Sequence, residues 1–196
     1  MYDKVNITEN TLQVLSLFTN GFDNEYYIRE VERSLEISPR TAQLILGDLE
    51  NKGVLESKVR GKIKSYKLKR SEVSFRYLVL VENYKLISFI EKNLLVKEVI
   101  EKIAPSIKGV SVIFGSYAKG TNKKGSDLDV FVAGECDTKE INSISEAWGI
   151  EVSVKTYPLK TFEDNIRKDV FLREVVKNHI IFLNADKFVN IVLTNG

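Results

Sequence analysis

The sequence predicts a mixed α/β protein of the α+β type. Three helices and a β-hairpin come first, then a long helix, then a small mixed sheet flanked by helices. Apolar residues repeat at helical spacing over residues 8–51, with glycine and proline as breaks. Residues 74–103 contain no glycine or proline, which predicts one long helix. From residue 106 onward, short β-branched runs alternate with amphipathic segments, as strands alternate with helices.

Length and composition limit the classes of function. The 196 residues suffice for one large domain or two small ones, and 43% apolar and 29% charged residues are typical of a globular protein. The net charge of +2 means that any contact with nucleic acid must come from a local patch. Cys136 is the single cysteine, which excludes an internal disulfide and fits a reducing compartment. Neither a signal peptide nor a membrane-spanning run is visible, so we expect a cytoplasmic protein with no membrane contact.

Residues 1–73 form the first predicted domain. Residues 8–20 and 25–35 carry apolar side chains at helical spacing. A third helix should begin at Ser38 and Pro39, because serine is a favoured cap and proline is favoured at the first helical position. The side chains expected to be exposed near its start include Arg40, Thr41 and Gln43.

The predicted hairpin covers residues 54–68, turns at residues 60–62 and is strongly basic. Three helices followed by such a hairpin resemble a winged helix-turn-helix domain, in which the third helix enters the major groove and the hairpin, or wing, contacts the backbone. The resemblance implies a double-stranded DNA partner, or an RNA. Lysines on an exposed hairpin can also serve only to keep sheet edges from pairing, and some winged helices bind proteins. The basic hairpin favours nucleic acid, bound by Arg40, Thr41, Gln43, Lys58, Arg60, Lys62 and Lys64.

The segment at residues 74–105 has a wide apolar stripe, so more than one of its surfaces should be covered. One interpretation is a helical connector that packs on both domains. The other is a dimerisation helix, which would make the protein a homodimer. The sequence does not separate the two.

The domain predicted at residues 106–196 is organised around two apolar strands joined by a glycine turn and a polar loop. The first strand ends at Gly115 and Ser116. Glycine lets the backbone approach a ligand closely, and Ser116 offers an N–H and a hydroxyl to phosphate oxygens. This turn is therefore suited to holding a phosphate.

Asp127 and Asp129 lie on the second strand. Because strand side chains alternate between faces, both aspartates project from the same side, about 6–7 Å apart. Two such carboxylates favour a bound cation, and oxygen ligands suit Mg²⁺ or Mn²⁺. A phosphate-binding turn beside a carboxylate pair is what phosphoryl or nucleotidyl transfer requires.

These residues also carry a resemblance to a known family. Gly115-Ser116, a gap and then Ser126-Asp127-Leu128-Asp129 resemble the signature of the polymerase β-like nucleotidyltransferase superfamily, in particular its minimal nucleotidyltransferase group. The resemblance implies transfer of a nucleoside monophosphate from an NTP, with ATP expected, to a hydroxyl acceptor that the sequence does not identify. It assigns metal binding and catalysis to Asp127 and Asp129, and nucleotide binding to Gly115, Ser116, Lys119 and Ser126.

The resembled family places a third carboxylate on the next strand, here residues 150–157. Glu151 occupies the matching place and would complete the catalytic metal site. Ser153 lies where another register would need an acid. A surface glutamate is the alternative interpretation of Glu151.

The C-terminal part is expected to contain a helix at residues 162–178, a strand at 180–183 and a closing segment at 188–193. His179, the only histidine, is expected to cap that helix rather than do chemistry. The fused winged helix supports a second hypothesis for the whole chain. In it, the protein is a DNA-binding transcriptional regulator whose nucleotidyltransferase domain senses a nucleotide or is an inactive scaffold.

Overall fold

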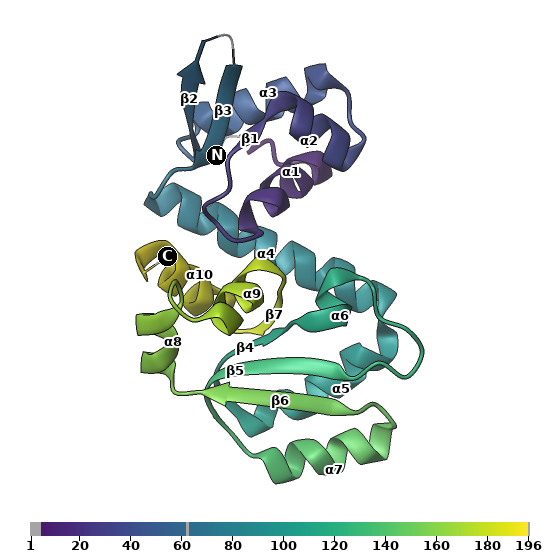
Figure 1. The fold of residues 1–196 in the computed structure, drawn as a ribbon. Helices are drawn as coiled ribbons and strands as arrows, with labels where there is room; N and C mark the ends of the chain where they lie inside the picture. Colours follow the sequence, from purple (N-terminus) through teal and green to yellow (C-terminus); the bar gives the residue numbers. More distant parts are fainter. Residues whose placement is uncertain (1–4, 62, 196) are drawn as a thin grey trace. The chain divides into compact units, whose positions relative to one another are not determined.

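A computed structural model describes residues 5–61 and 63–195, and the chain divides into two compact units between Val81 and Glu82. We call the part before this boundary unit 1 and the part after it unit 2, and describe each by itself (Figure 1). Within the described residues, no helix combines the length and apolar character needed to cross a membrane.

Unit 1 contains the three helices and the hairpin that the sequence predicts. Its elements are α1 (Glu9–Thr19), β1 (Tyr26–Tyr27), α2 (Ile28–Leu35), α3 (Pro39–Asn51), β2 (Leu55–Arg60) and β3 (Ile63–Leu68), and its antiparallel sheet has the order β1-β3-β2. Ser38 caps α3 as expected, because its Oγ accepts the Thr41 N–H at 3.0 Å. The short strand β1 was not predicted. It forms by pairing with Ser65 and Tyr66 of β3, a partner distant in sequence.

The long helix predicted at residues 74–103 is divided in two, which corrects the prediction. Helix α4 (Glu72–Lys92) ends before Asn93, and α5 (Leu94–Ile103) follows. Asn93 has φ −129° and ψ 63°, and its side-chain amide donates to the Phe89 carbonyl at 2.8 Å. A short polar side chain that bonds the backbone in this way competes with the helical hydrogen bonds, so the helix stops and restarts.

Unit 2 is built on a mixed four-stranded sheet of order β6-β5-β4-β7. Strands β5 and β6 are parallel, and the other two pairs are antiparallel. After the 3₁₀ turn η1 (Ala104–Ser106), the strands are β4 (Ile107–Ile113), β5 (Leu128–Cys136), β6 (Val152–Tyr157) and β7 (Ile180–Leu183). The remaining helices are α6 (Gly115–Lys119), α7 (Thr138–Trp148), α8 (Leu159–Asn165), α9 (Val170–Lys177) and α10 (Ala185–Asn195).

Alternate residues of β5 enter two different parts of the core. Leu128 and Val130 pack with the cluster that contains residues of α5 and α7. Phe131 points to the other face, where its ring centroid lies 5.5 Å from that of Phe162 in α8 and 5.7 Å from that of Phe171 in α9. Asp129 shares the face of Phe131, because side chains alternate along a strand. Asp127 precedes β5, which begins at Leu128, so the prediction that both aspartates lie on this strand holds for Asp129 only.

The single helix predicted at residues 162–178 is also two helices, α8 and α9. Asp169 starts a new helix, since its carboxylate accepts the Leu172 N–H at 3.0 Å. This second start changes which residues face the core. Leu172 is buried, whereas Val170, the first residue of α9, is 73% exposed.

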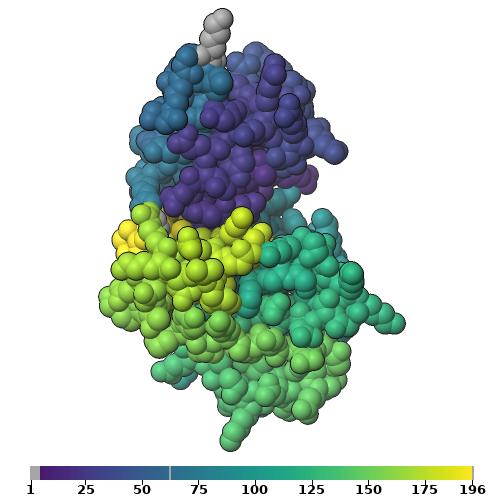
Figure 2. Space-filling model, viewed as in Figure 1, coloured from purple at the N-terminus to yellow at the C-terminus, as the bar shows by residue number. Residues whose placement is uncertain are grey.

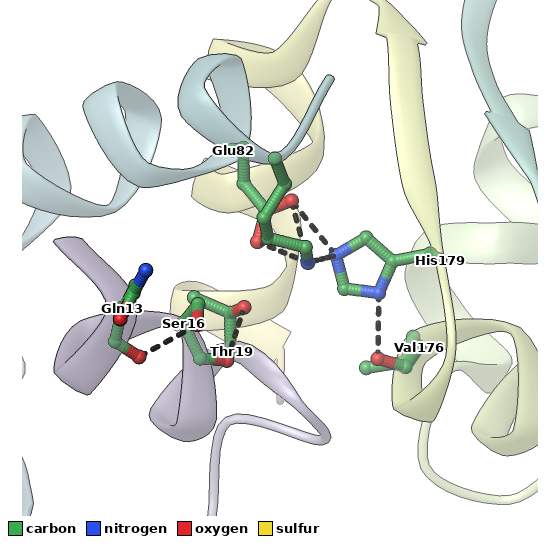
Figure 3. Close-up of polar contacts among 7 residues, drawn as sticks. Gln13, Ser16, Thr19, Glu82, Val176 and His179 are labelled. Carbon is green, nitrogen blue, oxygen red and sulfur yellow. Dashed lines mark hydrogen bonds and ion pairs between the residues drawn. The ribbon is translucent and has the colours of Figure 1, made fainter. Parts of the chain in front are cut away.

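Glu82 and His179 are buried side by side within unit 2 (Figure 3), and both contact the half-buried Lys85. His179 Nδ1 donates to the Val176 carbonyl at 2.8 Å, so His179 caps the last turn of α9. Its Nε2 lies 3.2 Å from Lys85 Nζ and 3.2 Å from a Glu82 carboxylate oxygen. Burial and the neighbouring Lys85 lower the pKa of His179, so the ring is neutral at neutral pH and Nε2 accepts from Lys85.

Glu82 is the anion among these three side chains. Burial raises the pKa of its carboxyl, but the charge and hydrogen bond of Lys85 outweigh burial, so the pKa is lowered and Glu82 is ionised at neutral pH. Because His179 is neutral, Lys85 is the counter-ion, with its Nζ 2.9 Å from the same oxygen of Glu82. The sequence located the helix cap but not the ion pair behind it.

Candidate functional site

The candidate site lies where β4 ends and β5 begins. These two strands are antiparallel neighbours, with Ile113 opposite Val130, so the segment after β4 lies beside the start of β5. The Phe114 N–H donates to the Asp129 carbonyl at 3.0 Å and fixes this approach. Gly115 then begins the short helix α6.

Gly115 and Asp129 are in direct contact. Gly115 has φ +67°, a left-handed conformation that other residues adopt only with strain. A Cβ added to it would lie 2.0 Å from Asp129 Oδ2 and 2.9 Å from Asp129 Cγ. The carboxylate of Asp129 therefore rests against bare backbone, and only glycine leaves room for it.

The electrostatics of the aspartate pair favour a cation. Asp127 is exposed and Asp129 is half-buried. Burial, and then the nearby charge of Asp127, raise the pKa of the Asp129 carboxyl. Two carboxylates thus stand close enough to repel each other, and a positive ion between them would relieve that repulsion.

The parallel pairing of β5 with β6 fixes where the third strand stands relative to the aspartates. Ser153 is the partner of Asp129, and Val152 is the partner of Leu128. Glu151 immediately precedes β6, its carbonyl accepts the Leu128 N–H at 2.7 Å, and its side chain is exposed. In the described part of the chain, no group of three or more His, Cys, Asp and Glu residues is placed to hold a metal ion. The structure thus brings Asp127 and Asp129 together, and the role of Glu151 stays a prediction.

The predicted nucleotide-binding side chains have partners of their own. Ser116 lies half-buried in α6. Lys119, at the end of α6, places its Nζ 2.7 Å from Glu174 of α9, and this contact is the main cause of the lowered pKa of Glu174. Ser126 Oγ accepts the Lys123 N–H at 2.8 Å and closes the polar loop. Figure 2 shows the teal segment that includes this loop at the surface.

Two further side chains near the site were not predicted. Glu174 is the partner of Lys119, and no sequence pattern links the two because they lie on different helices. Lys155 shares the face of Ser153 on β6, and its Nζ lies 3.7 Å from the ring centroid of Phe171. The alternation along residues 150–157 puts Glu151, Ser153 and Lys155 on one side, but it does not indicate the contact of Lys155 with Phe171.

The predicted nucleic-acid contacts all belong to unit 1. Arg40 and Gln43 are exposed on α3, Thr41 is half-buried beside Ser38, and Lys58 and Arg60 are exposed on β2. Lys64 places its Nζ 2.6 Å from Glu50 of α3, so it joins the hairpin to that helix. Lys62 lies outside the described residues.

Comparison with known proteins gives the family. A family model described as the nucleotidyltransferase domain matches residues 93–192, just over half of the chain. The match begins at Asn93, the residue between α4 and α5, and it includes the turn at Gly115, both aspartates and Glu151. Neither the curated proteins nor the solved structures that were searched contained a match. The chain therefore belongs to the nucleotidyltransferase domain family.

Proposed function

We propose that the protein transfers a nucleoside monophosphate from an NTP, with ATP expected, to a hydroxyl acceptor, at the site formed by Gly115, Asp127 and Asp129. Family membership supports nucleotidyl transfer in general. The observation that carries this particular site is the Asp129 carboxylate resting on the backbone of Gly115, beside a second aspartate. That arrangement places a glycine turn beside a pair of acids.

The residues present fit a divalent cation. Asp129 on β5 and Asp127 just before it supply hard oxygen ligands, and burial together with the charge of Asp127 raises the pKa of the Asp129 carboxyl. Asp127 and Asp129 would hold Mg²⁺ or Mn²⁺, with Glu151 as the proposed third ligand. When bound, the ion would neutralise phosphate charge and lower the pKa of an acceptor hydroxyl.

The other side chains would bind and orient the nucleotide. The turn at Gly115 lets the triphosphate approach the backbone, and Ser116 supplies a hydroxyl and an N–H. Lys119 could contact phosphate oxygens only by leaving its ion pair with Glu174. Both side chains are exposed, so breaking this ion pair costs little free energy. Asp129 would have to be ionised to act as a ligand, so metal affinity should rise with pH as its carboxyl loses the proton.

The test is titration of ATP, GTP, CTP and UTP in the presence of Mg²⁺. Wild-type protein should bind at least one of them, and the double variant Asp127→Asn/Asp129→Asn should not. The control is Glu98→Gln/Glu101→Gln, which removes the same charge from α5 and should bind as wild type does. Absence of binding by every triphosphate, or binding that the aspartate double variant retains, would refute the proposed site.

The hairpin supports a second candidate, a DNA-binding regulator whose nucleotidyltransferase domain is a sensor or scaffold. Among the described contacts, Lys58 and Arg60 form no ion pair, so both are available to phosphates. Substituting both by glutamate should abolish salt-dependent duplex binding. Duplex binding that survives Asp129→Asn, in a protein without transfer activity, would favour the regulator over the enzyme.

We also propose that the protein forms a homodimer through α4, which either candidate function allows. Val73, Leu80 and Ile87 are exposed apolar residues that recur every seven positions along this helix, and they therefore share one stripe. Light scattering of wild type and of Leu80→Glu/Ile87→Glu would test it. A dimer that the double variant converts to a monomer supports the interface, and a monomeric wild type refutes it.

A further inference from the structure

A groove of about 550 Å³ in unit 1 lies between the start of α2 and the end of β3 near the hairpin turn. The groove exists because β1 is only two residues long. Tyr26 and Tyr27 pair with Tyr66 and Ser65 of β3, but at Ile28 the chain turns away from the sheet and becomes α2. Figure 1 shows β1 leading into α2 beside the hairpin. The first two residues of β3, Ile63 and Lys64, therefore have no β1 residue beside them.

One wall of the groove is cationic. Arg29 and Arg33 are exposed, lie four residues apart on α2 and so share one side of the helix. Neither arginine takes part in an ion pair with another described residue. The acid that lines the groove, Glu30, is engaged locally, because its Oε2 accepts the Tyr27 N–H at 2.8 Å.

Other residues that line the groove are largely apolar yet open to water. Tyr27 is 38% exposed and Ile63 is 56% exposed, and both line the groove. A duplex presents phosphates and sugars outward and keeps its base faces stacked inside, so no base face is available to contact these apolar side chains. A single strand presents phosphates and unstacked bases together, and aromatic side chains beside a basic groove are how proteins commonly bind it.

We infer that this groove binds a single-stranded nucleic acid, with phosphates on Arg29 and Arg33 and a base against Tyr27 and Ile63. Lys64 lines the groove and was also assigned to duplex contact, but the other lining residues are distinct from the side chains of α3 and β2 assigned to that contact. The inference deepens the nucleic-acid contact proposed for unit 1 and does not depend on the transfer reaction.

The experiment is fluorescence anisotropy with labelled oligothymidine and oligouridine strands of about 12 nucleotides, within the usual site sizes of about 4–16. A hairpin duplex is the comparison probe. Removing two phosphate contacts with Arg29→Ala/Arg33→Ala should weaken strand binding at least tenfold and reduce the slope of log affinity against log salt by about 1.4, since each contact on a single strand contributes about 0.7. Both arginines are exposed, so this variant should keep the wild-type circular dichroism spectrum.

Tyr27 gives an independent test of the apolar part of the groove. Tyr27→Ala should weaken strand binding about tenfold at every salt concentration, because stacking does not release counterions. Tyr27→Phe should restore the affinity. The matched control is Arg70→Ala/Arg76→Ala, which removes two exposed arginines elsewhere in unit 1 and should leave strand binding within about twofold of wild type.

Three results would overturn the inference. The first is an affinity for the single strand that neither the double arginine variant nor Tyr27→Ala changes. The second is tighter binding of the duplex than of the strand. The third is competition by UMP or TMP that is as effective as competition by the strand. Asp127→Asn/Asp129→Asn should bind the strand as wild type does. This measurement separates the two proposals. If the transfer site is wrongly assigned, strand binding is unaffected, and if the groove is wrongly assigned, nucleotidyl transfer is unaffected.

Discussion

Replacing Gly115 by alanine should be far more costly than replacing another glycine of the same backbone conformation. Gly115 and Gly120 lie at the two ends of α6, with φ +67° and +66°. An alanine in this region costs about 1–2 kcal/mol at either position. A Cβ at Gly120 has no neighbour within 4 Å, whereas one at Gly115 lies 2.0 Å from Asp129 Oδ2. Displacing that carboxylate should add about 1–3 kcal/mol, the usual cost of overpacking.

The free energy of unfolding of unit 2 can be measured directly, because Trp148 in α7 is the only tryptophan of the chain. Urea unfolding followed by its fluorescence should give a loss of about 1–2 kcal/mol for Gly120→Ala and about 2–5 kcal/mol for Gly115→Ala. In an Asp129→Ala background, the atoms at 2.0 and 2.9 Å are gone and only Asp129 Cβ, at 3.3 Å, remains near. Gly115→Ala should then cost no more than Gly120→Ala does.

This cycle measures the contact between the glycine and the carboxylate, independently of any ligand. Equal losses for Gly115→Ala and Gly120→Ala, or a loss at Gly115 that persists in the Asp129→Ala background, would show that the carboxylate does not rest on this backbone. Metal-dependent ATP binding should also fall at least tenfold further in Gly115→Ala than in Gly120→Ala, a difference of about 1.4 kcal/mol.

Three further predictions concern charge. Glu151→Gln should weaken Mg²⁺-dependent ATP binding about tenfold, or about 1.4 kcal/mol, whereas Ser153→Ala should not, and the reverse result would reassign the third position to Ser153. Because the pKa of Asp129 is raised in the fold, its contribution to stability falls as pH rises above the usual range of an aspartate. Asp129→Asn should therefore raise the Tm at pH 7 in EDTA, by about 2–4 °C for each kcal/mol by which the free energy of unfolding increases. An unchanged or lower Tm would contradict the raised pKa of Asp129. The pKa of His179 is lowered in the fold, so the unfolded protein binds a proton on this histidine more readily than the folded protein does. The free energy of unfolding should therefore fall as the pH drops below about 6.5, and His179→Gln should reduce that fall. Urea midpoints measured between pH 7 and pH 5 would test both expectations.

Local chemistry explains which helices could be predicted. The start of α3 follows from Ser38 and Pro39 alone, since a cap and a first-turn proline act within a few residues. The break at Asn93 has a local cause too, but asparagine occurs inside many helices, and what ends this one is a particular side-chain bond to Phe89. Strand β1 could not be predicted from residues 26–27, because its partner is a hairpin that begins almost thirty residues later.

The candidate site divides in the same way. Gly115, Asp127 and Asp129 could be named as candidates because a glycine turn and two closely spaced acids are short-range patterns. The partner of Asp129 on β6 depends on the register of two strands separated by a helix, and a sequence pattern does not set that register. Both Glu151 and Ser153 share the alternation, and only the pairing shows that Ser153 stands opposite Asp129. The link between Lys119 and Glu174 is likewise a product of packing.

The structure bears on the choice between a ligand-binding site and an inert scaffold. Asp129 keeps a carboxylate half-buried beside another anion, which reduces the stability of unit 2, and Gly115 leaves bare backbone against that carboxylate. Neither is needed to pack the sheet, whose core lies at Leu128, Val130 and Phe131. A cation with a bound phosphate would compensate the charge and use the open backbone, so these features fit an enzyme or a nucleotide sensor better than a scaffold. The distinction between those two then depends on whether the nucleotide that binds is also consumed.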